Sequence, residues 1–325
     1  MINIFYDSNY FKRKRIFFTK QLKYSKFIVP YYKFCYKLNL PVNSNLIFSG
    51  PQQRINHLLK TFRKNEYVFN KITHDNHYIV QFDEFGKKQL NRILNKKRDG
   101  QKVIVGPLMD IPSTKQLIDI TNQFTNVKIL VASKHVKYNL IEEMGLNVQP
   151  KNIFVCPSGI VSNKKITLKN QERSGALIYF KKRNPEELDF VVKMLESRNI
   201  KYKLVHYGNY KNKDLNKLID NSKFGILLCR TESQGFAIQN MMARNLPLYV
   251  WDMKINRYGG YKLSGTSVSM WNEKCGRIAD NKKEFEEYFD VFINNLEKYS
   301  PEKFVKKELT YEKFEENMLN LFSSF

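Results

Sequence analysis

The fold of this chain is decided by the segment Glu232-Ser-Gln-Gly-Phe-Ala-Ile-Gln-Asn240-Met-Met-Ala-Arg-Asn-Leu-Pro247-Leu-Tyr-Val-Trp251-Asp252. An apolar run over residues 224–229 precedes it, and the segment passes through a short helical pattern into a second apolar run over residues 248–251. Strand, glycine-containing loop, helix and strand, in this order, build open parallel sheets. Because ligands bind such sheets beyond the carboxyl ends of the strands, we expect Glu232 and Asn240 to lie at a ligand site.

The same alternation of strand and helix occurs on both sides of a lysine-rich polar segment, residues 162–174. Before it, we expect strands at 45–49, 78–82, 103–105, 127–132 and 153–155, with helices at 52–62, 83–97, 114–121 and from Ser133 to about Gly145. Asp83 and Ser133 are the expected N-terminal caps of their helices. After it, we expect strands at 176–180 and 202–207, with helices at 185–198, 213–221, 282–299 and 311–322. The pattern predicts an α/β protein with two parallel sheets, and the domain boundary falls in the polar segment.

The composition of the chain excludes several classes of protein. The chain has 325 residues, of which 42% are hydrophobic, so it can bury two cores and is not disordered. No apolar run is long enough to span a bilayer, and the first residues lack the apolar region of a signal peptide. Four scattered cysteines indicate reduced thiols, so a cytoplasmic location is expected. We find no phosphate-binding Walker loop, no nucleophile elbow and no metalloprotease motif, and no metal site is expected.

The formal net charge of +24 is unevenly distributed. No acidic residue occurs between Ser8 and Asn65, and aromatic and basic residues alternate in the first part of that stretch. Such a surface attracts anionic lipids, nucleic acids or anionic glycans, so peripheral contact with a membrane is one interpretation. A solvated basic surface is the other, and both stay open. A basic nucleic-acid-binding protein is a weaker hypothesis, because no module for reading nucleic acid is visible.

The segment from 224 to 252 resembles the donor-sugar site of nucleotide-sugar glycosyltransferases of the GT-B class. The resemblance is closest to the retaining family 4, where two carboxylates separated by seven residues are followed by Ala and Pro before a strand. It is specific over 224–252, supportive at 156–160 and 176–183, and only topological over 1–155. It implies two Rossmann-like domains facing across a cleft: residues 1–161 for the acceptor and residues 162–300 for the donor. Residues 301–325 would return as a helix that braces the first domain.

The resemblance also implies an activity. A sugar would move, with retention of configuration and without a metal, from a UDP- or GDP-sugar substrate to a glycan, lipid or protein-linked acceptor. No tightly bound cofactor and no specific nucleic acid partner are implied. Glu232 would contact the donor sugar, and Lys182 and Arg183, with Lys181 beside them, would neutralise the leaving diphosphate. The remaining donor-side candidates are Ser233, Gln234, Gly235, Phe236, Ala237, Asn240, Tyr207 and Gly208. The acceptor-side candidates are Gly50, Pro51, His74, His77 and Gly106.

Several of these residues also have plainer interpretations. Without the family resemblance, Glu232 is interpreted as a solvated loop carboxylate and residues 181–183 as a basic turn. His74 and His77 are more simply surface histidines. Asn240 departs from the family pattern, because an amide offers one acceptor oxygen where a carboxylate offers two. The alternative to an active enzyme is therefore a catalytically weakened GT-B protein, a pseudoenzyme that binds glycans.

Overall fold

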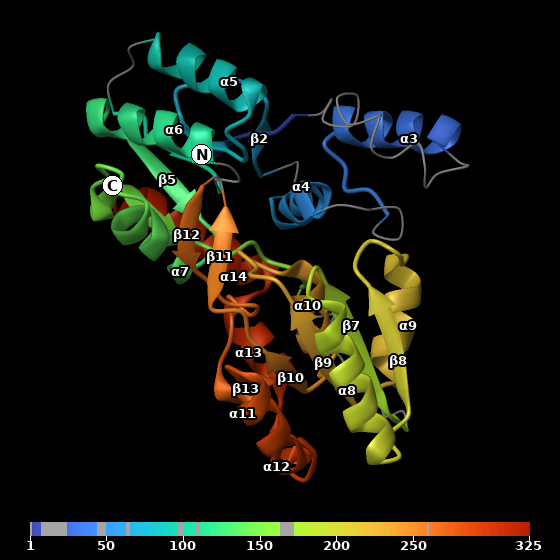
Figure 1. Cartoon of the computed structure of the whole chain (residues 1–325). Coiled ribbons are helices and arrows are strands. Elements are labelled where there is room, and N and C mark those ends of the chain that lie inside the picture. Colours follow the sequence, from blue (N-terminus) through green and yellow to red (C-terminus); the bar gives the residue numbers. More distant parts are fainter. Residues whose placement is uncertain are drawn as a thin grey trace. The chain divides into compact units, whose positions relative to one another are not determined.

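The computed structural model describes residues 2–7, 25–43, 50–62, 66–96, 100–107, 111–162, 172–258 and 260–325. The chain forms two compact units (Figure 1). Unit 1 comprises Met1–Ala132, Leu146–Ser158 and Glu315–Phe325, and unit 2 comprises Ser133–Gly145 and Gly159–Phe314. The predicted boundaries at 161 and 300 stay predictions. The strand expected at 45–49 and most of the basic aromatic stretch, residues 8–24, lie outside the described residues.

Unit 1 contains a six-stranded parallel sheet in the order β2-β1-β3-β4-β5-β6. Its strands are β1 (Ile2–Phe5), β2 (Val68–Phe69), β3 (Asn76–Ile79), β4 (Val103–Val105), β5 (Val127–Val131) and β6 (Ile153–Val155). Its helices are α3 (Ser25–Lys37), α4 (Gly50–Thr61), α5 (Glu84–Leu94), α6 (Ile111–Gln123) and most of α14 (Tyr311–Ser323). β1 and β4 are buried at every position, as expected for strands of a parallel sheet that helices cover on both faces.

Unit 2 contains a five-stranded parallel sheet in the order β13-β10-β9-β7-β8. The strands are β7 (Ala176–Lys181), β8 (Tyr202–His206), β9 (Phe224–Cys229), β10 (Leu248–Trp251) and β13 (Gly276–Ala279). The helices are α7 (Lys134–Tyr138), which continues as a π-helix over Asn139–Glu143, α8 (Pro185–Ser197), α9 (Asn212–Asn221), α10 (Phe236–Ala243), α11 (Lys282–Glu287), α12 (Phe289–Ile293) and α13 (Pro301–Glu308).

The two faces of the unit 2 sheet bury separate apolar clusters. Leu177 and Leu227 pack with side chains of α9, α10 and α13, whereas Ile178 and Leu228 pack with side chains of α8, α11 and α12. Successive residues of a strand point to opposite faces, so each near-continuous apolar run serves both clusters. A sheet covered in this way is doubly wound. The expected fold class, two parallel-sheet α/β domains, is therefore confirmed.

Several local expectations need correction. Gly50 does not end a strand but is the first residue of α4. The helix expected over 282–299 is divided into α11, α12 and a 3-10 turn at Leu296–Lys298. An antiparallel hairpin, β11 (Ile255–Tyr258) with β12 (Tyr261–Ser264), was not expected at all. Asp83, by contrast, caps α5 as predicted, because its carboxylate accepts from the backbone N–H of Gly86. In the part of the chain that is described, no helix is long and apolar enough to cross a membrane.

A substitution at Gly276, the first residue of β13, would show how closely the backbone of β13 packs against β10. Its φ is 142°, and a Cβ atom at this position would lie 1.9 Å from the carbonyl oxygen of Leu248. We expect Gly276→Ala to lower the free energy of unfolding by about 3 kcal/mol, from backbone strain and overpacking together. Gly260→Ala is the control, because Gly260 has a φ of 85° but no atom within 4 Å of such a Cβ. Urea unfolding would measure both variants, and equal losses would contradict the packing argument.

Candidate functional site

Three neighbouring strands of unit 2 bring polar side chains to one edge of the sheet. β7 lies between β8 and β9, and all three run parallel, so their carboxyl ends lie side by side. Lys181 ends β7, Tyr207 follows β8, and Glu232 follows β9 by three residues. The Lys181 ammonium forms an ion pair with the Glu232 carboxylate and lies 4.3 Å from the centroid of the Tyr207 ring. The structure thus joins three residues that were predicted from separate strand ends.

The Glu232 carboxyl lies in a largely dry environment, with 14% of its side chain exposed. Burial raises the pKa of Glu232, while the charges of Lys181 and Lys182 and the hydrogen bond from Lys181 oppose this rise. The backbone of Glu232 is held by a hydrogen bond from its N–H to the carbonyl oxygen of Thr266. A fixed carboxylate in such surroundings is a strong hydrogen-bond acceptor for a bound ligand.

The three consecutive cations after β7 have three different environments. Lys181 pairs with Glu232. Lys182 adopts a left-handed backbone conformation with φ of 52°, and its side chain is exposed. This turn directs Arg183 inward, where only 8% of the residue is exposed. The position of the lysines is consistent with the expectation that cations gather near Glu232.

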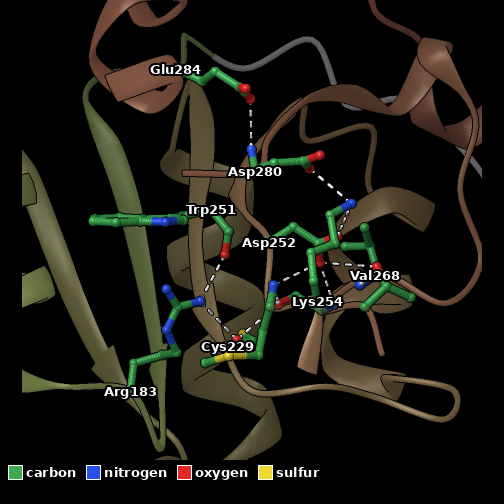
Figure 2. Close-up of polar contacts among 11 residues, drawn as sticks. Arg183, Cys229, Trp251, Asp252, Lys254, Val268, Asp280 and Glu284 are labelled. Carbon is green, nitrogen blue, oxygen red and sulfur yellow. Dashed lines mark hydrogen bonds and ion pairs between the residues drawn. The ribbon is translucent and has the colours of Figure 1, made fainter. Parts of the chain in front are cut away.

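All three nitrogen atoms of the Arg183 guanidinium donate to protein atoms, and Figure 2 shows the bonds to Cys229 and Trp251. Its Nη1 atom donates to the carbonyl oxygens of Cys229 at 3.2 Å and Trp251 at 2.8 Å. Its Nε and Nη2 atoms donate to both carboxylate oxygens of Glu187. The structure therefore corrects the expectation that Arg183 points toward a donor diphosphate: the side chain holds together the ends of β9 and β10 and the start of α8.

Asp252 is a structural partner of the site that the sequence analysis did not single out. Its Oδ1 atom accepts from the backbone N–H of Ser267 at 2.6 Å and from the hydroxyl of Thr266 at 3.0 Å. Its Oδ2 atom pairs with Lys254 at 3.0 Å (Figure 2). Since the carbonyl of Thr266 accepts from Glu232, Asp252 positions the loop that positions Glu232. Its position directly after an apolar strand is the feature of the sequence that could have identified Asp252.

The segment after Glu232 forms the start of α10. Gly235 is the residue before the helix and has a φ of 77°, a left-handed conformation that favours glycine. Gln234 is buried, and its backbone carbonyl accepts from Gln239 at 3.0 Å and from Ser269 at 3.2 Å. These contacts hold the loop before α10, whose first residues are Phe236 and Ala237, while Ser233 is exposed.

Asn240 lies in the second turn of α10. Its Nδ2 atom donates to the Oδ1 atom of Asn216 in α9 at 2.7 Å. This bond fixes the orientation of the amide, so the Oδ1 atom of Asn240 is the one that can accept from a ligand.

The segment Ser133–Gly145 belongs to unit 2 and places a histidine near Asp252. The Ser133 hydroxyl contacts the Nδ1 atom of His135 at 3.1 Å and forms no cap bond to α7, which corrects its expected capping role. Burial lowers the pKa of His135, and the charge of Asp252 opposes this effect. His135 is therefore mostly neutral at pH 7 and can donate or accept a hydrogen bond.

The residues expected on the acceptor side are scattered in unit 1. His77 lies inside β3, is fully buried and stacks on Phe5 with ring centroids 5.5 Å apart, so it is not a surface histidine. His74 is exposed but precedes β3, at the opposite edge of the sheet from the carboxyl ends. Gly106 does follow β4, and a Cβ atom there would lie 2.3 Å from the carbonyl oxygen of Leu130. Gly50 and Pro51 begin α4.

The raised pKa of Glu232 makes a prediction about stability and pH. Between the ordinary glutamate pKa of about 4.3 and the raised pKa of the folded state, the folded protein keeps a proton on Glu232 that the unfolded chain releases. The free energy of unfolding gained from this group is therefore largest at low pH and falls as the pH rises through the folded-state pKa. The free energy of unfolding of the wild type minus that of Glu232→Gln should therefore decrease as the pH rises from about 4 to 8, as measured by urea unfolding. Glu186→Gln, at an exposed position of α8, is the control, and a difference that grows with pH would contradict the assignment.

Comparison with known proteins supports the fold. No protein-family model matches the chain, and no curated protein matches it. Among solved structures, the GtfA/B complex is 13% identical over 78% of this chain and 58% of its own, with a TM-score of 0.53. TarM is 15% identical over 77% of this chain and 56% of its own, with a TM-score of 0.49. The pneumococcal O-GlcNAc transferase GtfA, solved with UDP and GlcNAc, is 11% identical over 78% of this chain and 57% of its own, with a TM-score of 0.46.

The chain thus spans a little over half the length of these similar structures. At such low identity the likeness concerns the fold alone, and the GtfA/B complex carries it. The two parallel-sheet α/β domains of this chain are therefore similar in fold to the GtfA/B complex.

Proposed function

We propose that this protein is a glycosyltransferase whose unit 2 binds a nucleotide-sugar donor. The observation that carries the proposal is the Lys181–Glu232 ion pair beside Tyr207, at the carboxyl ends of three adjacent parallel strands. This edge is where open α/β sheets bind nucleotides. The GT-B fold and the resemblance of residues 224–252 to a donor-sugar site support the same activity.

Each part of the donor would contact a different group of residues. The diphosphate would lie against the ammonium groups of Lys181 and Lys182 and the first amides of α10. The Tyr207 ring, which is exposed beside Gly208, offers a face for the nucleotide base. The Asn240 oxygen, fixed by Asn216, would accept from one ribose hydroxyl. Lysine side chains would neutralise the diphosphate, so the proposed reaction requires no metal.

The proposed reaction breaks the bond between the anomeric carbon and the diphosphate oxygen. A hydroxyl oxygen of the acceptor bonds to the anomeric carbon, its proton is released, and the nucleoside diphosphate departs with the bonding electrons. Glu232 would hydrogen-bond sugar hydroxyls, more strongly as positive charge develops at the anomeric carbon. Lys181 would move between Glu232 in the free protein and the diphosphate in the complex. Retention of configuration follows only from the family 4 resemblance.

The acceptor is assigned to unit 1, as a glycan or a lipid-linked sugar. Helix α3 supports an acceptor at a lipid surface, because Phe34 is 62% exposed and Tyr31 40% exposed beside the exposed Lys33 and Lys37. Exposed aromatic rings flanked by lysines are typical of helices that lie on anionic membranes.

Lys181 provides the sharpest test of donor binding. Lys181→Met should remove a cation from the diphosphate and lower the affinity for nucleoside diphosphates about tenfold or more. Lys193→Met, at an exposed position of α8, removes the same charge outside the site and should bind like wild type. Thermal unfolding with UDP, GDP, ADP and their sugars would measure the shift in Tm. Equal shifts in both variants would contradict the proposed site.

A pseudoenzyme is the second candidate, because Asn240 replaces a carboxylate and donates to Asn216 rather than accepting. Asn240→Glu would restore a bidentate acceptor for the ribose and should increase donor affinity several-fold if the site is active. Transfer and hydrolysis of the bound nucleotide-sugar would be assayed in parallel. Failure of both proteins to bind any nucleotide, or binding without turnover in both, would favour the pseudoenzyme.

A further inference from the structure

The described part of the chain contains two buried arginines, and they differ in their partners. Arg183 donates to a carboxylate and two backbone carbonyls, as described above. Arg54 in α4 is 7% exposed, and its Nη2 atom donates to the Ser158 hydroxyl at 3.1 Å. Within the described residues, the Nε atom of Arg54 is buried without a hydrogen-bond partner, and no carboxylate pairs with the guanidinium.

Arg54 lies at the carboxyl edge of the unit 1 sheet. Ser158 follows β6 by three residues. The Tyr78 hydroxyl, which interacts electrostatically with Arg54, donates to the carbonyl oxygen of Gly106 directly after β4, at 3.2 Å. The guanidinium is thus placed near the ends of β4 and β6, the edge at which a parallel sheet binds its ligand.

A buried guanidinium without a counter-charge is costly, and proteins normally pair it with an acid. Burial lowers the pKa of Arg54 to about 10, so the group still carries its charge at neutral pH. Its planar fork matches the oxygens of a phosphate. The Ser158 hydroxyl accepts from Arg54 and so orients the guanidinium. An anionic ligand would supply the missing partner.

We propose that Arg54, oriented by Ser158, forms a phosphate-binding subsite in unit 1, which holds a phosphate group carried by the acceptor. The inference deepens the proposed function, on which the identification of the ligand as the acceptor rests. Phosphate binding itself is measured without any donor or turnover, so its failure is distinguishable from failure of the glycosyltransferase assignment.

The test compares Arg54→Met with Lys115→Met, which removes the same charge from an exposed position of α6. Tm is measured in inorganic phosphate and in glycerol 1-phosphate, each against chloride at equal ionic strength. Phosphate should stabilise wild type and Lys115→Met alike, whereas Arg54→Met should lose most of the site-specific shift and bind about tenfold more weakly. A larger shift with glycerol 1-phosphate identifies an acceptor phosphate, and a shift confined to inorganic phosphate overturns the acceptor assignment.

Two further results keep the test decisive if Arg54→Met alters the fold. Ser158→Ala keeps the guanidinium but removes an acceptor of its Nη2 atom, so it should lower Tm in chloride and weaken phosphate binding less than Arg54→Met does. If Arg54 is only structural, Arg54→Met lowers Tm in chloride and responds to phosphate as Lys115→Met does. That outcome overturns the proposal.

Discussion

The hydrogen bonds of Arg183 connect three segments that are far apart in the chain. One guanidinium nitrogen donates to the ends of both β9 and β10, and the other two bind Glu187 at the start of α8. Such a charge is tolerated in the interior because each guanidinium nitrogen donates to an acceptor. Glu232 and Asp252 both follow strands that this side chain holds in register. The geometry of the candidate donor site therefore depends on Arg183, whose own side chain binds protein atoms and not the proposed ligand.

The parallel sheets were predictable because their strands are short apolar runs. β9 and β10 match the expected segments residue for residue, since full burial on both faces leaves few polar residues to obscure the pattern. The β11–β12 hairpin was not predictable from apolar content: it is largely polar, and Ile255 is exposed. β13 was missed because it is a four-residue strand that begins with a glycine and includes an arginine.

The candidate site was predictable only where the topology alone determines position. Residues that follow neighbouring parallel strands must lie together, which is why Glu232 and Lys181 meet. Lys181, Lys182 and Arg183 look alike in the sequence, however, and the left-handed conformation of Lys182 sends the third one inward. His77 was placed at the surface because histidine is polar, yet its position inside β3 buries it. Asn240 lies in the helix that the pattern predicted, but its bond to Asn216 joins α10 to α9, and a local sequence pattern does not reveal a contact between two helices.

The position of β8 at the border of the unit 2 sheet has a consequence for how copies of this protein behave at high concentration. A border strand presents unpaired backbone groups that can join the sheet of another molecule and start aggregation. β8 exposes Lys203 and His206 along its length, together with Leu204. A lysine on this strand places like charges opposite each other when two copies approach edge to edge. The strand that supports Tyr207 thereby also discourages self-association of the sheet.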